Sequence, residues 1–247
     1  MPLLEFHNFR TGEKANQTAI LKSLDDLPDK YLMSSSLALI AGGSDTTGFT
    51  FSYACWQLVQ NPVLAARLRE EVDALFEQAA PGYPSLTAME ASPLLYGFVK
   101  ESLRCALAIP GRLPRIVPGD GRAPLVVDGK EIPSGSVVGM SAYTMHRDPE
   151  IWGPDVLEFN PDRWIGQPSR AKAADIVIFS KGIRNCAGEP LASAELHMGL
   201  AFLSRRYDMR LVAGPREWSS MDYFVTTGPH FYVKLTPREG VPIPSIS

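Results

Sequence analysis

A proline-free run from residue 29 to residue 61 most constrains what this chain can fold into. Leu27-Pro28 stands at its start and Asn61-Pro62 at its end. Because proline suits a first helical turn and restricts the residue before it, we predict one helix over about 28–60, roughly 45 Å long. Polar residues keep its apolar stretches short of the roughly 18 consecutive apolar residues of a membrane span. We therefore predict a buried helix that crosses the whole protein.

The middle of this helix, Gly42-Gly43-Ser44-Asp45-Thr46-Thr47, is its least regular part. Glycine forms helix weakly, and threonine hydroxyls can bond back to preceding carbonyls, which causes kinks. We expect a local distortion beside Asp45. A solvated Asp-Thr-Thr step on a helix surface is the other interpretation of this segment.

Hydrophobic periodicity and turn residues predict short elements around a mainly helical core. Asn61 should cap the helix that follows it, Asp128-Gly129 should form a hairpin turn, and Thr87-Ala88-Met89-Glu90 resembles a capping box. Further helices are predicted over 62–78, 94–107 and 190–206, strands over 125–127, 130–132, 136–140, 209–212 and 231–235, and ordered coil over 147–178. The fold class is therefore mainly α with small β-sheets, in a single unit of 1–247.

Composition and charge narrow the function classes. The chain has 247 residues, of which 45% are hydrophobic, enough to bury a substantial core. Its net charge of −3 gives no basic excess, so we expect no nucleic-acid partner. Its three widely spaced cysteines fit neither a disulfide framework nor a paired zinc site, which favours a reducing compartment.

The amino terminus and the histidines give only negative expectations. Met1 to His7 contains no basic region and no sustained apolar run, so we expect no signal peptide and no transmembrane anchor in this chain. His146 and His197 have no partner at the spacing of metal ligands. We expect packed or solvated roles for both.

The segment from Phe179 to Gly188, Phe-Ser-Lys-Gly-Ile-Arg-Asn-Cys-Ala-Gly, carries the clearest chemistry. Its two glycines, Gly182 and Gly188, let the backbone approach a flat ligand. Cys186 stands just before a predicted helix, whose dipole and free amides stabilise a thiolate. Without further support, a lone cysteine in such a turn is most often a small buried hydrophobe.

This segment matches every fixed position of the haem-binding pattern Phe-x-x-Gly-x-Arg-x-Cys-x-Gly, and the chain therefore resembles the cytochrome P-450 superfamily. Such a match arises by chance on the order of once in ten thousand chains or less. The resemblance implies that Cys186 is the axial thiolate ligand of the iron of haem b, where it favours O–O cleavage. It also implies that Arg184 pairs with a haem propionate. The other residues assigned to the haem-binding loop 179–188 are Phe179, Gly182 and Gly188.

A Glu-x-x-Arg pair, Glu101 and Arg104, places opposite charges at i, i+3 on one helical face. Such a pair is a weak signal alone, since most are surface salt bridges. In the family it joins the arginine of a later segment, here Arg163, in a buried network that supports the cysteine loop.

Two more segments resemble family motifs. Gly42 to Thr47 matches the oxygen-activation motif of the long central helix, which implies that Asp45 shuttles protons and Thr46 positions water. Leu113-Pro114-Arg115 resembles the segment whose arginine reaches the other propionate.

Positional resemblance also suggests which residues face a substrate. Leu107 to Arg112 and Tyr223 to Thr227 are mostly apolar or small, which suits a hydrophobic small molecule. Leu107 and Ile109 fit a purely structural role in the core equally well.

The resemblance covers only the carboxy-terminal half of the P-450 fold, since members of the family are roughly twice this length. Three explanations stay open: a truncated gene product, a short haem protein completed by self-association or another chain, and a fragment of a longer enzyme. In each case apolar surface on the central helix needs a cover.

The resemblance implies a haem-thiolate monooxygenase that inserts one atom of dioxygen into an apolar small molecule, with electrons from an NADPH-cytochrome reductase. The Phe-Ser-Lys-Gly-x-Arg-Asn-Cys variant is similar to those of fungal secondary metabolism, so a terpenoid or polyketide intermediate is the expected substrate. The expected location is the cytoplasm or the cytosolic face of the endoplasmic reticulum. The alternatives are a haem-binding catalyst of a non-oxidative reaction and an inactive fragment.

Overall fold

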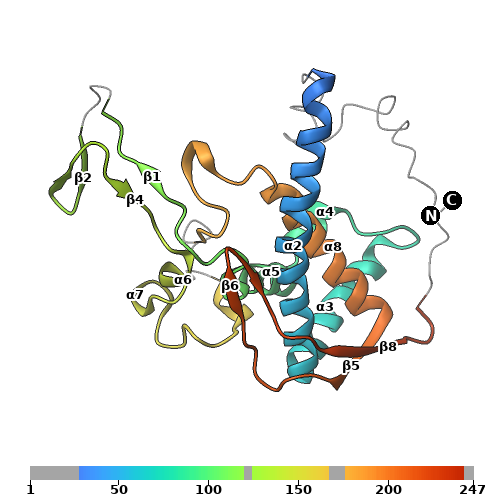
Figure 1. The fold of residues 1–247 in the computed structure, drawn as a ribbon. Helices are drawn as coiled ribbons and strands as arrows, with labels where there is room; N and C mark the ends of the chain where they lie inside the picture. The colour runs from blue at the N-terminus through green and yellow to red at the C-terminus, as the bar shows by residue number, and fades with distance from the viewer. Residues whose placement is uncertain (1–27, 120–123, 167–175, 242–247) are drawn as a thin grey trace.

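The computed structural model describes residues 28–119, 124–166 and 176–241. The predictions for Met1 to His7 and for the coil at 167–175 lie outside these residues. The described part is mainly helical, with small two-stranded sheets at its periphery (Figure 1). None of its helices combines the length and the apolar character that crossing a bilayer requires.

The long helix α2 (Asp29–Gln60) organises the molecule (Figure 1). Its second half is built into the core, where Tyr53, Ala54, Trp56 and Leu58 are all less than a tenth exposed. These residues supply two adjoining hydrophobic clusters, a large one of aliphatic and aromatic residues that is the main core and a small one around Tyr53 and Trp56. The second half of α2 is therefore the wall against which the other helices pack.

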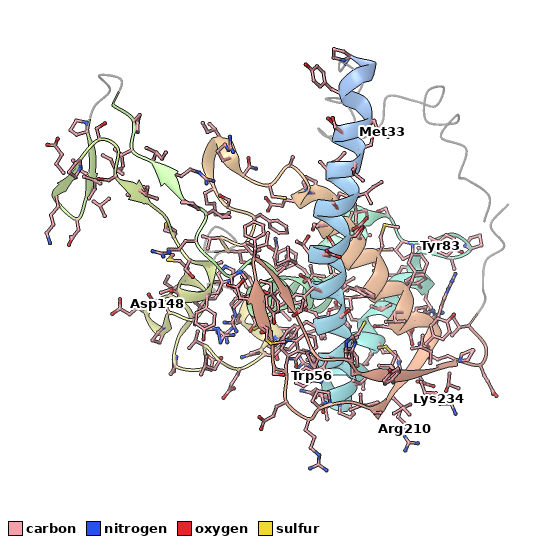
Figure 2. The ribbon with its side chains drawn as sticks, viewed as in Figure 1. Met33, Trp56, Tyr83, Asp148, Arg210 and Lys234 are labelled. Atoms are coloured by element: carbon pink, nitrogen blue, oxygen red, sulfur yellow. The ribbon has the colours of Figure 1, made fainter. Side chains whose placement is uncertain are left out.

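The first half of α2 extends beyond the other elements, with Met33 near its free end and Trp56 at the packed end (Figure 2). Met33, Leu37 and Ile40 are 79%, 65% and 64% exposed. The prediction of a helix buried along its whole length is therefore wrong for this half. Its residues are apolar enough to be buried, but no described element packs against them.

The helix α2 also stays continuous through its glycine- and threonine-rich middle. The Thr46 hydroxyl donates to the Gly42 carbonyl at 2.8 Å, and the Thr50 hydroxyl donates to the Thr46 carbonyl at 3.0 Å. The predicted back-bonding is present, but the expected distortion does not interrupt the helix at Asp45.

Three helices pack on the second half of α2, namely α3 (Pro62–Ala79), α5 (Pro93–Ala106) and α8 (Glu189–Arg206). A fourth, α4 (Leu86–Ala91), packs on α5 and α8. As predicted, the Asn61 side chain caps α3 by accepting the Leu64 amide at 3.0 Å, and α3 buries an apolar stripe that includes Leu68 and Val72.

The prediction of a capping box at Thr87 is wrong. The helix α4 begins two residues earlier, and its cap is Ser85, whose hydroxyl accepts the Ala88 amide at 3.1 Å. Ser85 has an extended backbone, as a cap residue does, whereas Thr87 already lies inside the helix.

The strands form antiparallel pairs. They are β1 (Arg115–Ile116) with β4 (Val137–Val138), β2 (Leu125–Val127) with β3 (Lys130–Ile132), β5 (Tyr207–Ala213) with β8 (Tyr232–Pro237), and β6 (Met221–Tyr223) with β7 (Val225–Thr227). Asp128 and Gly129 both have positive φ, 50° and 71°, which makes the predicted Asp-Gly hairpin turn. The β6–β7 hairpin was not predicted from the sequence.

Short helices punctuate the coil between these pairs. They are α6 (Ala142–Met145), α7 (Pro149–Trp152) and the 3₁₀ helices η2 (Pro161–Trp164) and η4 (Gly182–Arg184). The predicted coil at 147–178 therefore contains two single-turn helices in its described part. Trp152 and Trp164 anchor it to the main core.

Gly97 permits the close approach of α5 and η2. A Cβ atom at Gly97 would lie 2.5 Å from the backbone oxygen of Pro161, which cannot move as a side chain can. The two elements carry Glu101 and Arg163, so their spacing matters for the site described below.

Replacing Gly97 should therefore destabilise the fold. We expect Gly97→Ala to lower the free energy of unfolding in urea by about 1–3 kcal/mol because of overpacking. The control is Gly48→Ala on the exposed side of α2, where no atom lies within 4 Å. It should be neutral or stabilise by up to about 1 kcal/mol. Equal losses in both variants would contradict this account.

Candidate functional site

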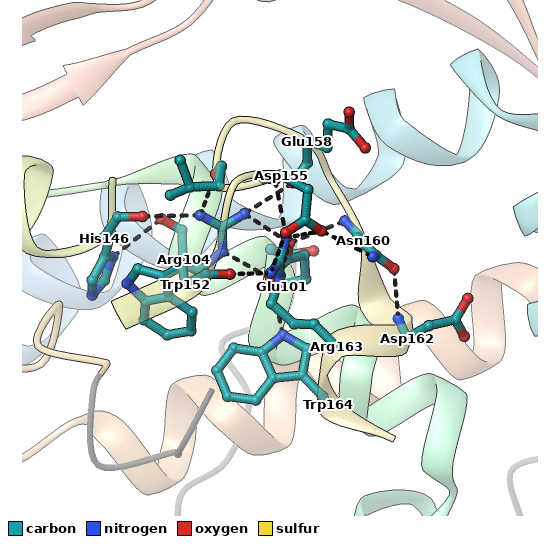
Figure 3. Close-up of polar contacts among 12 residues, drawn as sticks. Glu101, Arg104, His146, Trp152, Asp155, Glu158, Asn160, Asp162, Arg163 and Trp164 are labelled. Carbon is teal, nitrogen blue, oxygen red and sulfur yellow. Dashed lines mark hydrogen bonds and ion pairs between the residues drawn. The ribbon is translucent and has the colours of Figure 1, made fainter. Parts of the chain in front are cut away.

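Glu101 lies at the centre of a buried polar network (Figure 3). The side chain is 0% exposed. Its oxygens accept two hydrogen bonds from Arg104, at 2.9 and 2.8 Å, and one from Arg163 at 3.0 Å. The Asn160 amide and the Trp164 indole donate at 3.0 and 2.9 Å. The charge of this carboxylate is thus fully compensated, as burial requires.

Arg104 uses all of its five N–H donors. Besides Glu101, its guanidinium donates to the carbonyls of His146, Val156 and Glu158 at 2.9, 2.7 and 2.9 Å. Burial alone would lower the pKa of Arg104, but the hydrogen bonds and charge of Glu101 raise it above its usual value. The side chain is therefore a permanent cation that holds the coil of 146–158 by its backbone.

Arg163 extends the network to Asp155. Its guanidinium donates to the Trp152 carbonyl at 2.8 Å and to an Asp155 carboxylate oxygen at 2.9 Å. Partial burial works to raise the pKa of Asp155, but hydrogen bonds from Arg163 and Asn160 hold it below its usual range. Arg163 thus meets Glu101 and Arg104 in one cluster, although it lies 62 residues from Glu101 in the sequence.

His146 adjoins this cluster and is 0% exposed (Figure 3). Its Nδ1 lies 3.1 Å from the Arg104 carbonyl oxygen, and its Nε2 accepts the Val177 amide at 2.9 Å. Burial lowers the pKa of His146 to about 4. His146 therefore has a packed role, one of the two expected from the sequence.

The segment that carries Cys186 is a tight loop closed by its own backbone. The Cys186 amide donates to the Phe179 carbonyl at 2.7 Å, and the 3₁₀ helix η4 lies between them. Ser180 and Gly182 have positive φ, 62° and 74°, and reverse the chain. Helix α8 follows at Glu189 with no side chain capping its amides. Cys186 is thus presented at the amino-terminal, electropositive end of an 18-residue helix.

Cys186 differs from the other two cysteines in its surroundings. Cys186 is exposed, whereas Cys55 and Cys105 are partly shielded by the core. Burial raises the pKa of both Cys55 and Cys105 to about 12, so they stay protonated at neutral pH. Among the three, Cys186 is the one exposed on the surface.

Asp45 and Thr46 lie on the outer half of α2, with Asp45 exposed and Thr46 partly so. Helix α2 packs on α8 where Gly199 makes room for Phe51. A Cβ at Gly199 would lie 2.7 Å from the Phe51 ring. This contact fixes the spacing between the helix that carries Asp45 and Thr46 and the helix that begins after Cys186.

The three remaining predicted haem contacts differ in their surroundings. Arg115 is exposed on β1, and its guanidinium donates to the carbonyls of Leu113 and Pro114 rather than to the cysteine loop. Arg184 is exposed at the end of η4 and forms no ion pair with another described residue. The Phe179 ring packs against the main core, so its contribution to the loop is its carbonyl.

The two predicted substrate-facing segments meet beside a cavity of about 570 Å³. The Thr226 amide donates to the Ala108 carbonyl at 2.9 Å, and the Thr226 hydroxyl to the Leu107 carbonyl at 2.7 Å. Helix α2 supplies Tyr53 and Trp56 to the same cavity. Leu107 is also 4% exposed, as its structural interpretation expects.

Comparison with protein families identifies the class of the chain. The cytochrome P450 family model matches residues 10–235. The chain therefore belongs to the cytochrome P450 family, which implies a haem cofactor.

The curated relatives are fungal cytochrome P450 monooxygenases. The chain is 37% identical to oblB of Emericella variicolor over 73% of this chain and 32% of the relative. It is 32% identical to hepC of Aspergillus oryzae, over 92% and 44% respectively. With oblB of Cochliobolus heterostrophus the identity is 35%, over 90% and 39%. The chain thus spans about two fifths of the length of the relatives it matches.

The described residues fit a haem beside Cys186. Its thiol is exposed, nothing lies within 4 Å of a Cβ placed on Gly182, and the Ile183 side chain is fully exposed. A flat macrocycle can therefore approach the loop without moving its backbone. Cys186 would hold the iron, and Arg184 is free to meet a propionate.

Sequence reasoning missed Asp155, Trp164 and the specific contacts of His146. Trp164 directly follows Arg163, which was assigned to the network from the sequence, so its role was the easiest of the three to predict. Asp155 and His146 have no local signal. The partners of His146 lie 42 and 31 residues away, and Asp155 meets Arg163, 8 residues away, only where the coil folds back on itself.

Removing the central charge should be costly. We expect Glu101→Gln to lower the free energy of unfolding by about 3–5 kcal/mol, because the buried guanidinium of Arg104 loses its counter-charge and that of Arg163 keeps only Asp155. Arg67→Gln is the control, since its ion pair with Asp162 is about half exposed on both sides and should be worth at most about 1 kcal/mol. Urea unfolding followed by circular dichroism compares them. A loss below about 1 kcal/mol for Glu101→Gln would contradict the central role of this carboxylate.

Proposed function

We propose that this chain is the haem-binding, carboxy-terminal half of a cytochrome P450 monooxygenase, folded as one unit over 1–247. The observation that carries the proposal is the exposed Cys186, presented at the start of α8 by a loop with the complete haem-binding pattern. Bound haem b would supply the activation of dioxygen and the insertion of one of its atoms into a substrate. NADPH-cytochrome reductase would deliver the electrons.

The roles of the other residues follow from their positions. The amino-terminal end of α8 would stabilise the negative charge of a haem-ligating sulfur at Cys186. The Thr46 hydroxyl donates to a helix carbonyl, so its lone pairs remain to hold a water molecule. The exposed carboxylate of Asp45 can exchange protons between that water and solvent.

The remaining assigned residues bind or brace. Arg184 and Arg115 would pair with the two haem propionates. Glu101, Arg104 and Arg163 would brace the cysteine loop by fixing the coil that packs beneath it. Their complete mutual pairing supports this role.

The substrate we propose is an apolar small molecule, a terpenoid or polyketide intermediate of fungal secondary metabolism. The apolar and small residues at 107–112 and 223–227 support an apolar ligand. The similarity to fungal P450 monooxygenases supports the pathway type.

The partner we propose is polypeptide equivalent to the amino-terminal half of the relatives. Met33, Leu37 and Ile40 stand at i, i+4 and i+7, so they form one apolar stripe on the exposed half of α2. An upstream segment, a separate chain or a second copy would cover that stripe. The proposed location is the cytoplasm or the cytosolic face of the endoplasmic reticulum.

The test of the haem site is the carbon monoxide difference spectrum of the purified, dithionite-reduced chain, expressed with a haem precursor. We expect a strongly red-shifted Soret band, which reports a thiolate ligand, and its complete loss in Cys186→Ala. Cys55→Ala is the control and should keep the band, because Cys55 lies away from the loop inside α2. A band that survives in Cys186→Ala would overturn the proposal.

The role of Thr46 in proton delivery is tested by the amount of product formed per NADPH consumed. With haem, reductase, NADPH and an oxidisable apolar substrate, Thr46→Ala should consume NADPH while forming several-fold less product, because water is no longer held. Ser44→Ala is the control, since its hydroxyl makes the same kind of back-bond, at 2.7 Å to Ile40. Unchanged coupling in Thr46→Ala would remove Thr46 from the mechanism.

The alternative functions have their own signatures in these experiments. A thiolate band without NADPH consumption would favour a haem-binding, non-oxidative catalyst. The absence of any haem band in the unmodified chain would favour an inactive fragment. This alternative is supported by the coverage of about two fifths of the relatives' length.

A further inference from the structure

His146 connects two separate parts of the fold through its two ring nitrogens. Nδ1 lies 3.1 Å from the backbone oxygen of Arg104, at the end of α5. Nε2 lies 2.9 Å from the backbone nitrogen of Val177, at the start of the segment that leads to Cys186. The ring itself is enclosed and packs edge-on against Trp152, 6.0 Å between centroids.

These two contacts admit one protonation state only. An amide N–H can only donate, so Nε2 must carry a lone pair. A carbonyl oxygen can only accept, so Nδ1 must carry the proton. The ring is therefore neutral, with its proton on Nδ1. A protonated ring would point a second N–H at the Val177 N–H and lose that hydrogen bond.

Val177 is close to Cys186 through backbone hydrogen bonds. The Val177 carbonyl accepts the Ser180 amide at 2.8 Å, and the Phe179 carbonyl accepts the Cys186 amide at 2.7 Å. Ile176, next to Val177, is 4% exposed in the main core. A displacement of Val177 would therefore pass directly into the turn that closes on the cysteine.

We propose that neutral His146 is a positioning residue, which fastens the cysteine loop to the Glu101–Arg104 network and so holds Cys186 in place for haem. The part of this statement that concerns haem rests on the proposed function. The part that concerns the loop does not require haem at all.

The surroundings of His146 make its hydrogen bond with the Val177 amide depend on pH. Arg104 on α5 and Lys181 in the cysteine loop disfavour protonation, whereas Glu101 on α5 favours it, and burial dominates. The pKa of His146 is about 4 when the ring is buried and bonded to Val177, and about 6.5 for a free histidine. A His146 ring released from Val177 therefore binds the proton more readily. The hydrogen bond from the Val177 amide to His146 is thus fully favoured above about pH 6.5 and weakens as the pH falls toward 4.

Two variants separate the two contacts. The amide nitrogen of asparagine stands near the position of Nδ1, so His146→Asn can still donate to Arg104 but does not reach Val177. Glutamine extends to the position of Nε2, so its carbonyl oxygen in His146→Gln can accept the Val177 amide without titrating. His197→Asn is the matched control, because His197 is also buried but its Nδ1 contacts only Ser193 of the same helix.

Amide hydrogen exchange of the haem-free chain, followed by NMR, is the first measurement. In His146→Asn, the Val177 and Cys186 amides should exchange at least tenfold faster, while Ala201 in the core of α8 is unchanged. His146→Gln and His197→Asn should leave all three amides close to the unmodified chain. An unchanged Cys186 amide, or equal acceleration of all three amides in His146→Asn, would overturn the proposal.

The unmodified chain provides a test that needs no variant. Between pH 7 and pH 5, the protection of Val177 and Cys186 should fall roughly twentyfold more than that of Ala201, the factor that pKa values of about 4 and 6.5 give. The same fall in His146→Gln, which has no proton to gain there, would overturn the proposal.

The haem-loaded chain gives the last readout. The fraction of bound haem that gives the red-shifted thiolate band in the carbon monoxide spectrum should drop in His146→Asn. It should return to the level of the unmodified chain in His146→Gln. If the unmodified chain shows no such band, the proposed function fails, and the exchange measurements still decide the role of His146. A full thiolate band in His146→Asn would overturn the positioning of Cys186.

Discussion

The buried carboxylate of Glu101 is the interaction on which the rest of the structure depends. An unpaired charge in this position would cost several kcal/mol, so the fold is stable only when its donors are all in place. Those donors come from α5, from the coil before η2 and from η2 itself. The network therefore selects one arrangement of a coil that has little regular structure of its own, and Arg104 fixes the same coil by three of its carbonyls.

The ordered coil in turn connects the network to the cysteine loop. Trp152 and Trp164 pack against each other in the main core with tilted rings, 5.5 Å between ring centroids. His146 stands between α5 and Val177. A polar cluster without direct contact to Cys186 is thus connected to the cysteine loop through buried and partly buried hydrogen bonds.

The features that the sequence predicts well are those with local causes. Prolines mark the ends of the long helix, the Asn61 side chain caps α3, and Asp128-Gly129 makes a hairpin turn, because each depends on residues a few positions apart. The prediction of Thr87 as a cap failed because serine and threonine both cap helices, and Ser85, two residues earlier, takes that position. The contacts of Trp164 with Glu101 span 63 residues and depend on tertiary structure alone. Exposure of the outer part of α2 was equally beyond prediction, because apolar residues indicate a capacity for burial and not the presence of a neighbour.

The division of α2 into a packed and an unpacked half has a consequence for its motions. In the packed half, opening a helical turn would also expose Ala54 and Leu58, so that half opens only with the whole core. In the other half no described element covers Met33, Leu37 or Ile40, so core packing does not oppose fraying there, and glycines at 42 and 43 lower the helix propensity further. Local stability therefore declines along a single continuous helix. Asp45 and Thr46 lie between its stable, packed end and its less stable, exposed end.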